Sequence, residues 1–102
     1  MTTADTPVGT AVEINGDEIA DGIAVWLEME SPTLDVEAVN RMVDTVQADF
    51  EAAGLTTRRA PGEVGYGDLL QAFGPDAEPD GPKANEPGIL VLSHIDTVHP
   101  IG

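Results

Sequence analysis

Ile89 to Leu92 form an unbroken apolar run directly after Gly88, and this run limits the folds open to the chain more than any other feature. A strand made only of apolar residues is typical of an α/β sheet, in which both faces of the strand are covered. A chain of 102 residues can form one small domain, and an aromatic content of 4% leaves few bulky side chains to fill its interior. We therefore predict an α/β fold with a thin core.

The segment from Asn15 to Glu30 has the pattern of an amphipathic helix. Asn15 and Glu18 have the spacing of a capping box at its start. Pro32 disfavours helical geometry at Ser31, so the helix is expected to end near Glu30. An apolar stripe at helical spacing forms the expected buried face, with the indole as part of the core: Ile19, Ile23, Trp26 and Leu27.

A second helix follows, and it carries the clearest periodic signal in the chain. Asp35 is placed to cap its first turn, and Glu37 suits the positive end of the helix dipole. Gly54 stands where a residue in the left-handed conformation would end the helix. The apolar positions fall on one stripe: Val36, Val39, Val43, Val46 and Phe50.

Two short strands are expected after the second helix, at residues 55–59 and 66–73. The second strand should present three side chains on one side: Leu69, Gln71 and Phe73. Residues 74–88 contain four prolines, three glycines and four acids, a composition that cannot bury apolar surface. This stretch is therefore expected to be an exposed loop.

Together these elements give the predicted fold class: α/β, with two helices packed on about three strands of an incomplete mixed sheet. The predicted domain covers residues 16–102. Residues 1–15 are expected to form a flexible N-terminus, because their first part is small, polar and without period.

The charge balance is strongly acidic, since 19 acidic residues against 4 basic ones give a net charge of −15. Such a chain repels nucleic-acid phosphates and anionic membranes, so neither is an expected partner. General solubility is the favoured explanation, and adaptation to a salt-rich cytoplasm stays open. Arg58 and Arg59 are interpreted as surface charge balance. The start of the chain lacks the features of a signal peptide and no run reaches membrane-spanning length, so the expected location is the cytoplasm.

His94 and Asp96 follow the apolar run, at the strand end where ligands and catalytic groups collect in α/β sheets. In an extended backbone both point to the same side, so the imidazole can hold a metal while the carboxylate fixes the ring. The chain has no cysteine, which leaves His, Asp and Glu as metal ligands. For a bare His-x-Asp pair, a hydrogen bond at a strand end and a capped turn are the commoner explanation. His99, just before Pro100, is expected to lie in a loop and not to bind metal.

The segment Gly-Ile-Leu-Val-Leu-Ser-His-Ile-Asp-Thr-Val, residues 88–98, resembles the first metal motif of a zinc-hydrolase family. This family comprises glutamate carboxypeptidases, acetylornithine deacetylases, succinyl-diaminopimelate desuccinylases and aminoacylases. Thr97-Val98, with Ser93 before the histidine, resembles the glutamate carboxypeptidase branch most. Upstream, the segment from Trp26 to Thr33 is similar to the family's helix ending in an acidic-Ser-Pro stretch, so the resemblance covers about residues 16–102.

The resemblance implies that the chain is the N-terminal fragment of a zinc-dependent carboxypeptidase or amidohydrolase. Such an enzyme uses metal-activated water to hydrolyse the amide bond of a small peptide or N-acyl amino acid, next to a carboxylate-bearing residue. His94 would bind one of two zinc ions, and Asp96 would be the catalytic-site residue that orients it. The family's other ligands and its general base would lie beyond residue 102. The fragment alone is expected to be inactive, because catalytic zinc needs about three protein ligands.

A different class of function also agrees with the sequence. A non-catalytic acidic module could bind a partner, or a second copy of the chain, through an exposed sheet edge. This alternative leaves His94 and Asp96 without a metal role.

Overall fold

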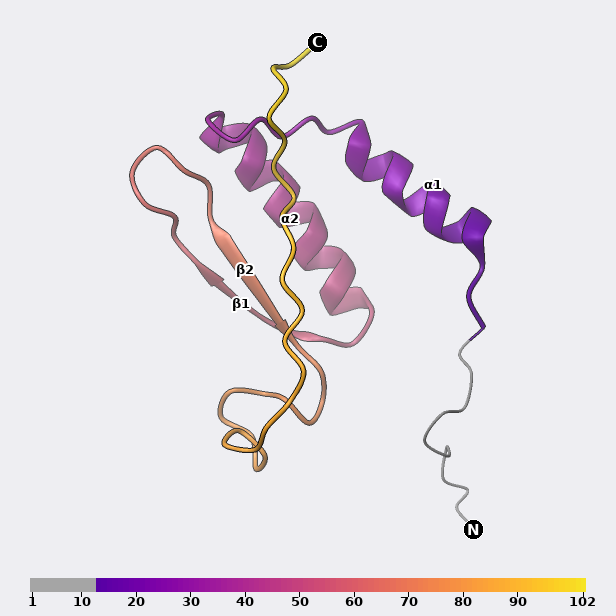
Figure 1. Cartoon of the computed structure of the whole chain (residues 1–102), viewed down its shortest axis with the longest axis vertical. Helices are drawn as coiled ribbons and strands as arrows, with labels where there is room; N and C mark the ends of the chain where they lie inside the picture. Colours follow the sequence, from indigo (N-terminus) through magenta and orange to yellow (C-terminus); the bar gives the residue numbers. More distant parts are fainter. Residues whose placement is uncertain (1–12) are drawn as a thin grey trace.

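A computed structural model of the chain describes residues 13–102, in which two helices precede two strands (Figure 1). The helices are α1, Gly16–Leu27, and α2, Val36–Ala52, and the strands are β1, Thr56–Ala60, and β2, Leu69–Phe73. The predicted flexible N-terminus, residues 1–15, lies outside the described residues except for its last three. Within residues 13–102, no helix combines the length and the apolar character needed to cross a membrane. The α/β class with two helices is confirmed.

The core of the described chain lies along α2. Asp35 caps this helix by accepting a hydrogen bond from the Ala38 amide at 3.0 Å, and Gly54 follows its end with a φ of 91°. Both features agree with the sequence pattern. Only Val36 and Phe50, at the two ends of the predicted stripe, are half-buried instead of buried. The buried apolar side chains of residues 13–102 all come from α2: Ala38, Val39, Met42, Val43 and Val46.

β1 and β2 form an antiparallel hairpin that packs against α2. Thr57 Oγ1 accepts from the side-chain amide of Gln47 at 3.0 Å, and Arg59 binds Asp44, so this face of the hairpin is turned toward α2. As the alternation predicted, three residues of β2 lie on the opposite face: Leu69, Gln71 and Phe73. The register places four residues on the face toward the helix: Thr57, Arg59, Leu70 and Ala72.

Arg59 is more than a surface charge, which corrects the interpretation of this residue from sequence. Its guanidinium binds Asp44 of α2, and its Nε donates to Asp68 Oδ2 at 2.8 Å, just before β2. The hydrogen bond with Asp44 is the main cause that raises the pKa of Arg59. Arg58 lies on the other face, where its guanidinium stands 5.5 Å from the centre of the Phe73 ring. Successive strand residues face opposite sides, so the two arginines have different roles.

α1 begins as predicted and ends earlier than predicted. The Asn15 side chain accepts from the Glu18 amide at 3.1 Å, as expected for an N-cap. The helix ends at Leu27, the chain turns directly afterwards, and Glu30 has a φ of 40°.

No residue of α1 is buried, so the expected packing of both helices on the sheet holds for α2 alone. Three members of the apolar stripe are exposed, Ile19 by 50%, Ile23 by 48% and Leu27 by 69%. Trp26 is half-buried, and its indole lies near α2 instead of in a core. The physical reason is that β1 and β2 pack on α2, and no described strand lies against the stripe of α1.

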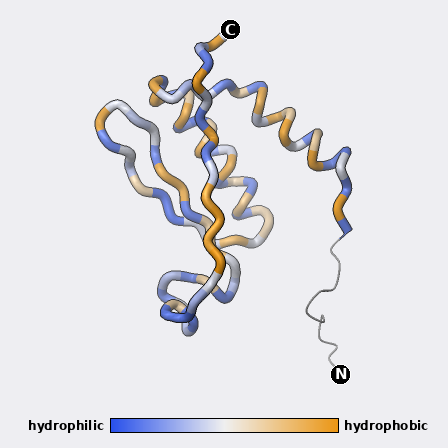
Figure 2. The backbone as a smooth tube through the Cα atoms, in the orientation of Figure 1, coloured by the Kyte–Doolittle hydropathy of each residue, from blue (hydrophilic) through white to orange (hydrophobic). Residues whose placement is uncertain are grey.

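The apolar run Ile89 to Leu92 does not form the predicted third strand, so the sheet is two-stranded and antiparallel instead of mixed. Its four side chains are between 79% and 96% exposed, where the sequence predicted cover on both faces. The run stands out as an apolar stretch of the tube in Figure 2. A strand needs a neighbour to pair with its backbone groups, and residues 13–102 supply none for this run. The loop before it, residues 74–88, is largely exposed, as predicted.

Candidate metal centre

The loop between the helices and the segment after the apolar run meet in a short parallel bridge between Pro32 and Thr97. The Thr97 amide donates to the Ser31 carbonyl at 2.8 Å, and the Thr33 amide donates to the Thr97 carbonyl at 2.9 Å. In a parallel bridge the residues on either side of one partner supply both bonds, so the bridge does not need the amide hydrogen that Pro32 lacks. The Pro32–Thr97 bridge fixes the backbone on which His94 and Asp96 are carried.

Ser31 is buried beside this bridge and hydrogen-bonds the segment that carries Asp96. Its hydroxyl donates to the Ile95 carbonyl at 2.6 Å, and the residue is 1% exposed. Ser31 is the one buried polar residue among residues 13–102, and its hydrogen bond satisfies it. The sequence analysis identified Ser31 only as part of an acidic-Ser-Pro stretch and predicted no hydrogen-bond partner for it.

Asp96 is held by the other side of the same loop. The Thr33 hydroxyl lies 2.7 Å from Asp96 Oδ2 and donates to it. This hydrogen bond is the largest cause that lowers the pKa of the Asp96 carboxyl; partial burial opposes it, while the Asp96 amide and His94 add to the lowering. The carboxylate is 32% exposed, so it is screened from water on one side and remains ionised at neutral pH.

His94 lies next to Asp96, as the sequence predicted, but with a different main contact. Its Nδ1 is 2.9 Å from the Asp96 carbonyl oxygen and 3.3 Å from Oδ1 of the carboxylate. A carbonyl can only accept a hydrogen bond, so Nδ1 carries the proton in this geometry. The neutral ring then has its lone pair on Nε2, the nitrogen that can bind a metal.

The surroundings of His94 suit one ligand of a metal site and no more. The His94 side chain is 83% exposed, so a metal can approach Nε2. However, residues 13–102 contain no group of three or more His, Asp or Glu side chains that could hold a metal together. His99 is exposed, in keeping with its predicted place in a loop. A single imidazole beside one carboxylate falls short of the three ligands or so of a catalytic zinc site.

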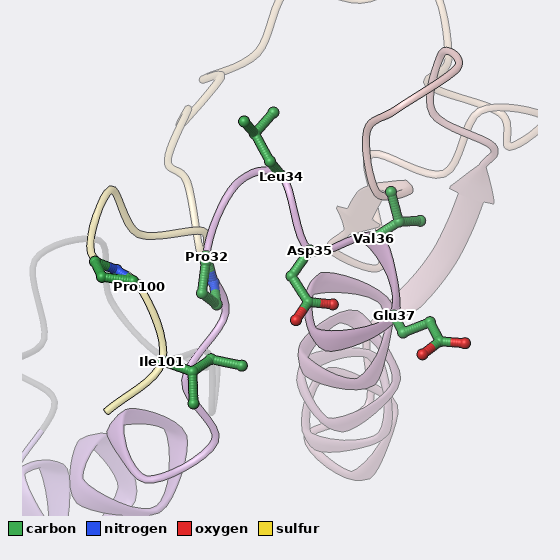
Figure 3. Close-up of a pocket in the computed structure, with 7 residues that line it drawn as sticks. All are labelled: Pro32, Leu34, Asp35, Val36, Glu37, Pro100 and Ile101. Atoms are coloured by element: carbon green, nitrogen blue, oxygen red, sulfur yellow. The ribbon is translucent and has the colours of Figure 1, made fainter.

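An open hollow of about 660 Å³ lies beside the Pro32–Thr97 bridge (Figure 3). Neither His94 nor Asp96 lines it, so it is separate from the candidate metal position. Its walls come from the loop, the first turn of α2 and the C-terminal segment: Pro32, Leu34, Asp35, Val36, Glu37, Pro100 and Ile101.

Sequence reasoning proposed His94 and Asp96 as site residues and did not predict the Ser31 and Thr33 hydrogen bonds to residues 95 and 96. Thr33 and Asp96 are 63 positions apart, and Ser31 and Ile95 are 64 apart, so no local pattern pairs them. A hydroxyl on each side of Pro32 was the available signal, because serine and threonine there are free to bond a crossing segment.

Comparison of the chain with protein-family models, with curated proteins and with solved structures finds no match.

Proposed function

We propose that residues 16–102 are the N-terminal portion of the catalytic domain of a zinc-dependent carboxypeptidase or amidohydrolase. The substrate class is a small peptide or an N-acyl amino acid, cleaved at an amide bond next to a carboxylate. The observation that carries the proposal is the His94 Nδ1 contact with Asp96, because it uses Nδ1 and leaves Nε2 as the nitrogen that can bind a metal, on a side chain that is 83% exposed. The resemblance of residues 88–98 to a zinc-hydrolase motif supports the same role.

In this proposal His94 would hold zinc through Nε2, and Asp96 would keep the ring in the required orientation. When bound, zinc supplies Lewis acidity that lowers the pKa of a water molecule and polarises an amide carbonyl. The Asp96 carboxylate, ionised at neutral pH, favours the Nδ1–H form of the ring and increases the basicity of Nε2.

The exposed apolar run supports a larger parent domain. Ile89 to Leu92 are 79% to 96% exposed, although their composition is that of a strand buried on both faces. Additional strands and helices would cover this run and bring further ligands to the end that carries His94. By itself, the described set of one imidazole and one orienting carboxylate would leave the chain inactive.

Zinc titration by calorimetry tests the proposal, on this chain and on the full-length protein that the proposal implies. The variants are His94→Ala and, as a matched control, His99→Ala, which removes a second exposed imidazole five positions away. We expect tight binding by the full-length protein that His94→Ala weakens by at least about tenfold and that His99→Ala leaves unchanged. Equal losses of zinc affinity in the two variants, or an affinity that neither variant changes, would overturn the role of His94.

A second candidate function is a non-catalytic acidic interaction module, and one observation favours it. The exposed apolar side chains of residues 89–92 and of α1 form unpartnered surface on a chain with a net charge of −15. Such a module would bind a partner or form a homo-oligomer through the 89–92 segment. A zinc-independent complex that persists in His94→Ala, together with absence of zinc binding, would favour this candidate over the hydrolase.

A further inference from the structure

The Thr33 hydroxyl has a defined place relative to Asp96. The main chain of Thr33 is fixed by the Pro32–Thr97 bridge, through its amide bond to the Thr97 carbonyl at 2.9 Å. Threonine is branched at Cβ, so its side chain has few alternative orientations once the backbone is fixed. The hydroxyl therefore meets Asp96 Oδ2 at 2.7 Å from a preset position, with the Thr97 carbonyl at 3.0 Å as its second neighbour.

One oxygen of the carboxylate is thereby held by Thr33 while the other faces the imidazole. With Oδ2 bonded to the hydroxyl, Oδ1 stays 3.3 Å from His94 Nδ1. Rotation of the Asp96 side chain would break the bond to Thr33 and take Oδ1 away from the ring. Because His94 is 83% exposed, the Asp96 contacts are the ones that set the direction of its ring.

We propose that Thr33 is a positioning residue of the candidate metal centre, which holds the Asp96 carboxylate in the rotamer that faces Nδ1 of His94. This inference deepens the proposed function and rests on the role of His94 as a zinc ligand. Thr33 acts through Asp96, because its hydroxyl contacts Asp96 Oδ2 and the Thr97 carbonyl.

Ser31 provides the comparison that separates positioning from simple support of the fold. Its hydroxyl donates to the Ile95 carbonyl at 2.6 Å and has no bond to the Asp96 carboxylate. Ser31 and Thr33 flank the same proline and hold the same crossing segment. Loss of the Ser31 hydroxyl loosens the main chain, whereas loss of the Thr33 hydroxyl frees the carboxylate.

The first test measures the Asp96 side chain in the zinc-free protein by its Hα–Hβ three-bond couplings in NMR. Wild type and Thr33→Ser, which keeps the hydroxyl, should show two unequal couplings, the signature of a single rotamer. Thr33→Val, which keeps the shape and removes the hydroxyl, should show averaged couplings, and Ser31→Ala should keep unequal ones. Unchanged couplings in Thr33→Val overturn the inference, and so does the same averaging in Ser31→Ala.

The second test measures zinc affinity of the full-length protein in the same variants. Loss of a residue that hydrogen-bonds a metal ligand typically weakens metal binding by about 10–100-fold. Thr33 contacts Asp96 and not the ligand His94 itself, so we expect about tenfold weaker zinc binding for Thr33→Val. Thr33→Ser keeps the hydroxyl without the Cβ branch and should bind zinc more tightly than Thr33→Val. A normal zinc affinity in Thr33→Val contradicts the inference.

The two tests also separate this inference from the proposed function. If the couplings behave as expected while no variant binds zinc through His94, Thr33 still positions Asp96 and the hydrolase proposal fails. If His94 binds zinc and the couplings of Thr33→Val match wild type, the hydrolase proposal stands and the role of Thr33 is refuted.

Discussion

The indole nitrogen Nε1 of Trp26 on α1 lies 2.8 Å from Oδ2 of Asp49 on α2 and donates a hydrogen bond to it. This bond connects a helix that has no buried residue to the helix that carries the core. A helix of 12 residues is marginal in water without tertiary packing. The attachment of α1 therefore depends strongly on Trp26.

Replacement of Asp49 by Ala should loosen α1 with little effect on the core. Trp26 is the single tryptophan of the chain, so its fluorescence reports on this contact directly. We expect emission at longer wavelength and about two- to tenfold faster amide exchange in α1, the effect of losing one hydrogen bond. Asp21→Ala, which removes an exposed carboxylate from α1 itself, is the control. Equal changes in both variants would show that charge, and not the bond to Trp26, attaches the helix.

Arg59→Ala should destabilise the hairpin more than Arg58→Ala. Arg59 is 25% exposed and joins Asp44 of α2 to Asp68, whose carboxylate is also 25% exposed. Its loss leaves a half-buried carboxylate without its cation, and we expect a decrease of about 1–2 kcal/mol in the free energy of unfolding, discounted because Asp44 is exposed. Arg58 contacts Phe73 on the outer face, where a cation–π contact is worth about 0.5–1 kcal/mol. Urea unfolding of both variants measures the difference, and a reversed order would contradict this account.

Local signals explain what could be predicted from the sequence. The caps Asn15 and Asp35 act on amides three residues away, so their spacing alone identifies them. The stripe of α2 was predictable because a helix of 17 residues repeats its buried face several times.

Long-range contacts explain what could not be predicted. Pairing of Thr33 with Asp96 depends on the bridge between Pro32 and Thr97, which are 65 positions apart, and no short pattern encodes it. The apolar run at residues 89–92 indicated a buried strand, yet burial depends on neighbours that a single segment does not specify. Alternation along a strand puts Arg58 and Arg59 on opposite faces, but only the packing of the hairpin on α2 decides that Arg59 is the one turned toward the helix.

Gly67→Ala should destabilise the chain through a clash with the core. A Cβ at Gly67 would overlap Cγ1 of Val39, which is 6% exposed, and would lie 3.2 Å from the Asn40 side-chain oxygen. Overpacking of this kind costs about 1–3 kcal/mol, and thermal unfolding should show the loss. Gly74→Ala is the matched control, because a Cβ there meets nothing within 4 Å. Equal melting temperatures for the two variants would mean that the turn before β2 shifts to accommodate the Cβ without loss of stability.

Asp96 should contribute stability that is lost in acid. The Thr33 hydrogen bond lowers the pKa of its carboxyl below 3.8, the value expected in the unfolded chain. A group whose pKa is lower in the folded state stabilises the fold above its unfolded pKa and loses this contribution as pH falls through the folded value. The difference in unfolding free energy between wild type and Asp96→Asn should therefore be largest near neutral pH and shrink below pH 3.8. A difference that stays constant with pH in urea unfolding would show that the carboxylate charge is not what matters.

The exposed run at residues 89–92 should dominate the binding of hydrophobic dyes and any self-association of the chain. Leu90 is 79% exposed within this run, whereas Val64 is 101% exposed as an isolated apolar side chain in the turn before β2. Leu90→Lys and Val64→Lys add the same positive charge to a chain of net charge −15, which weakens self-repulsion equally in both. A charge within the run interrupts a continuous apolar edge, so only Leu90→Lys should reduce dye fluorescence and sedimentation of oligomers. Equal reductions of dye fluorescence and oligomer formation in the two variants would mean that the chain self-associates through another surface, for example the exposed stripe of α1.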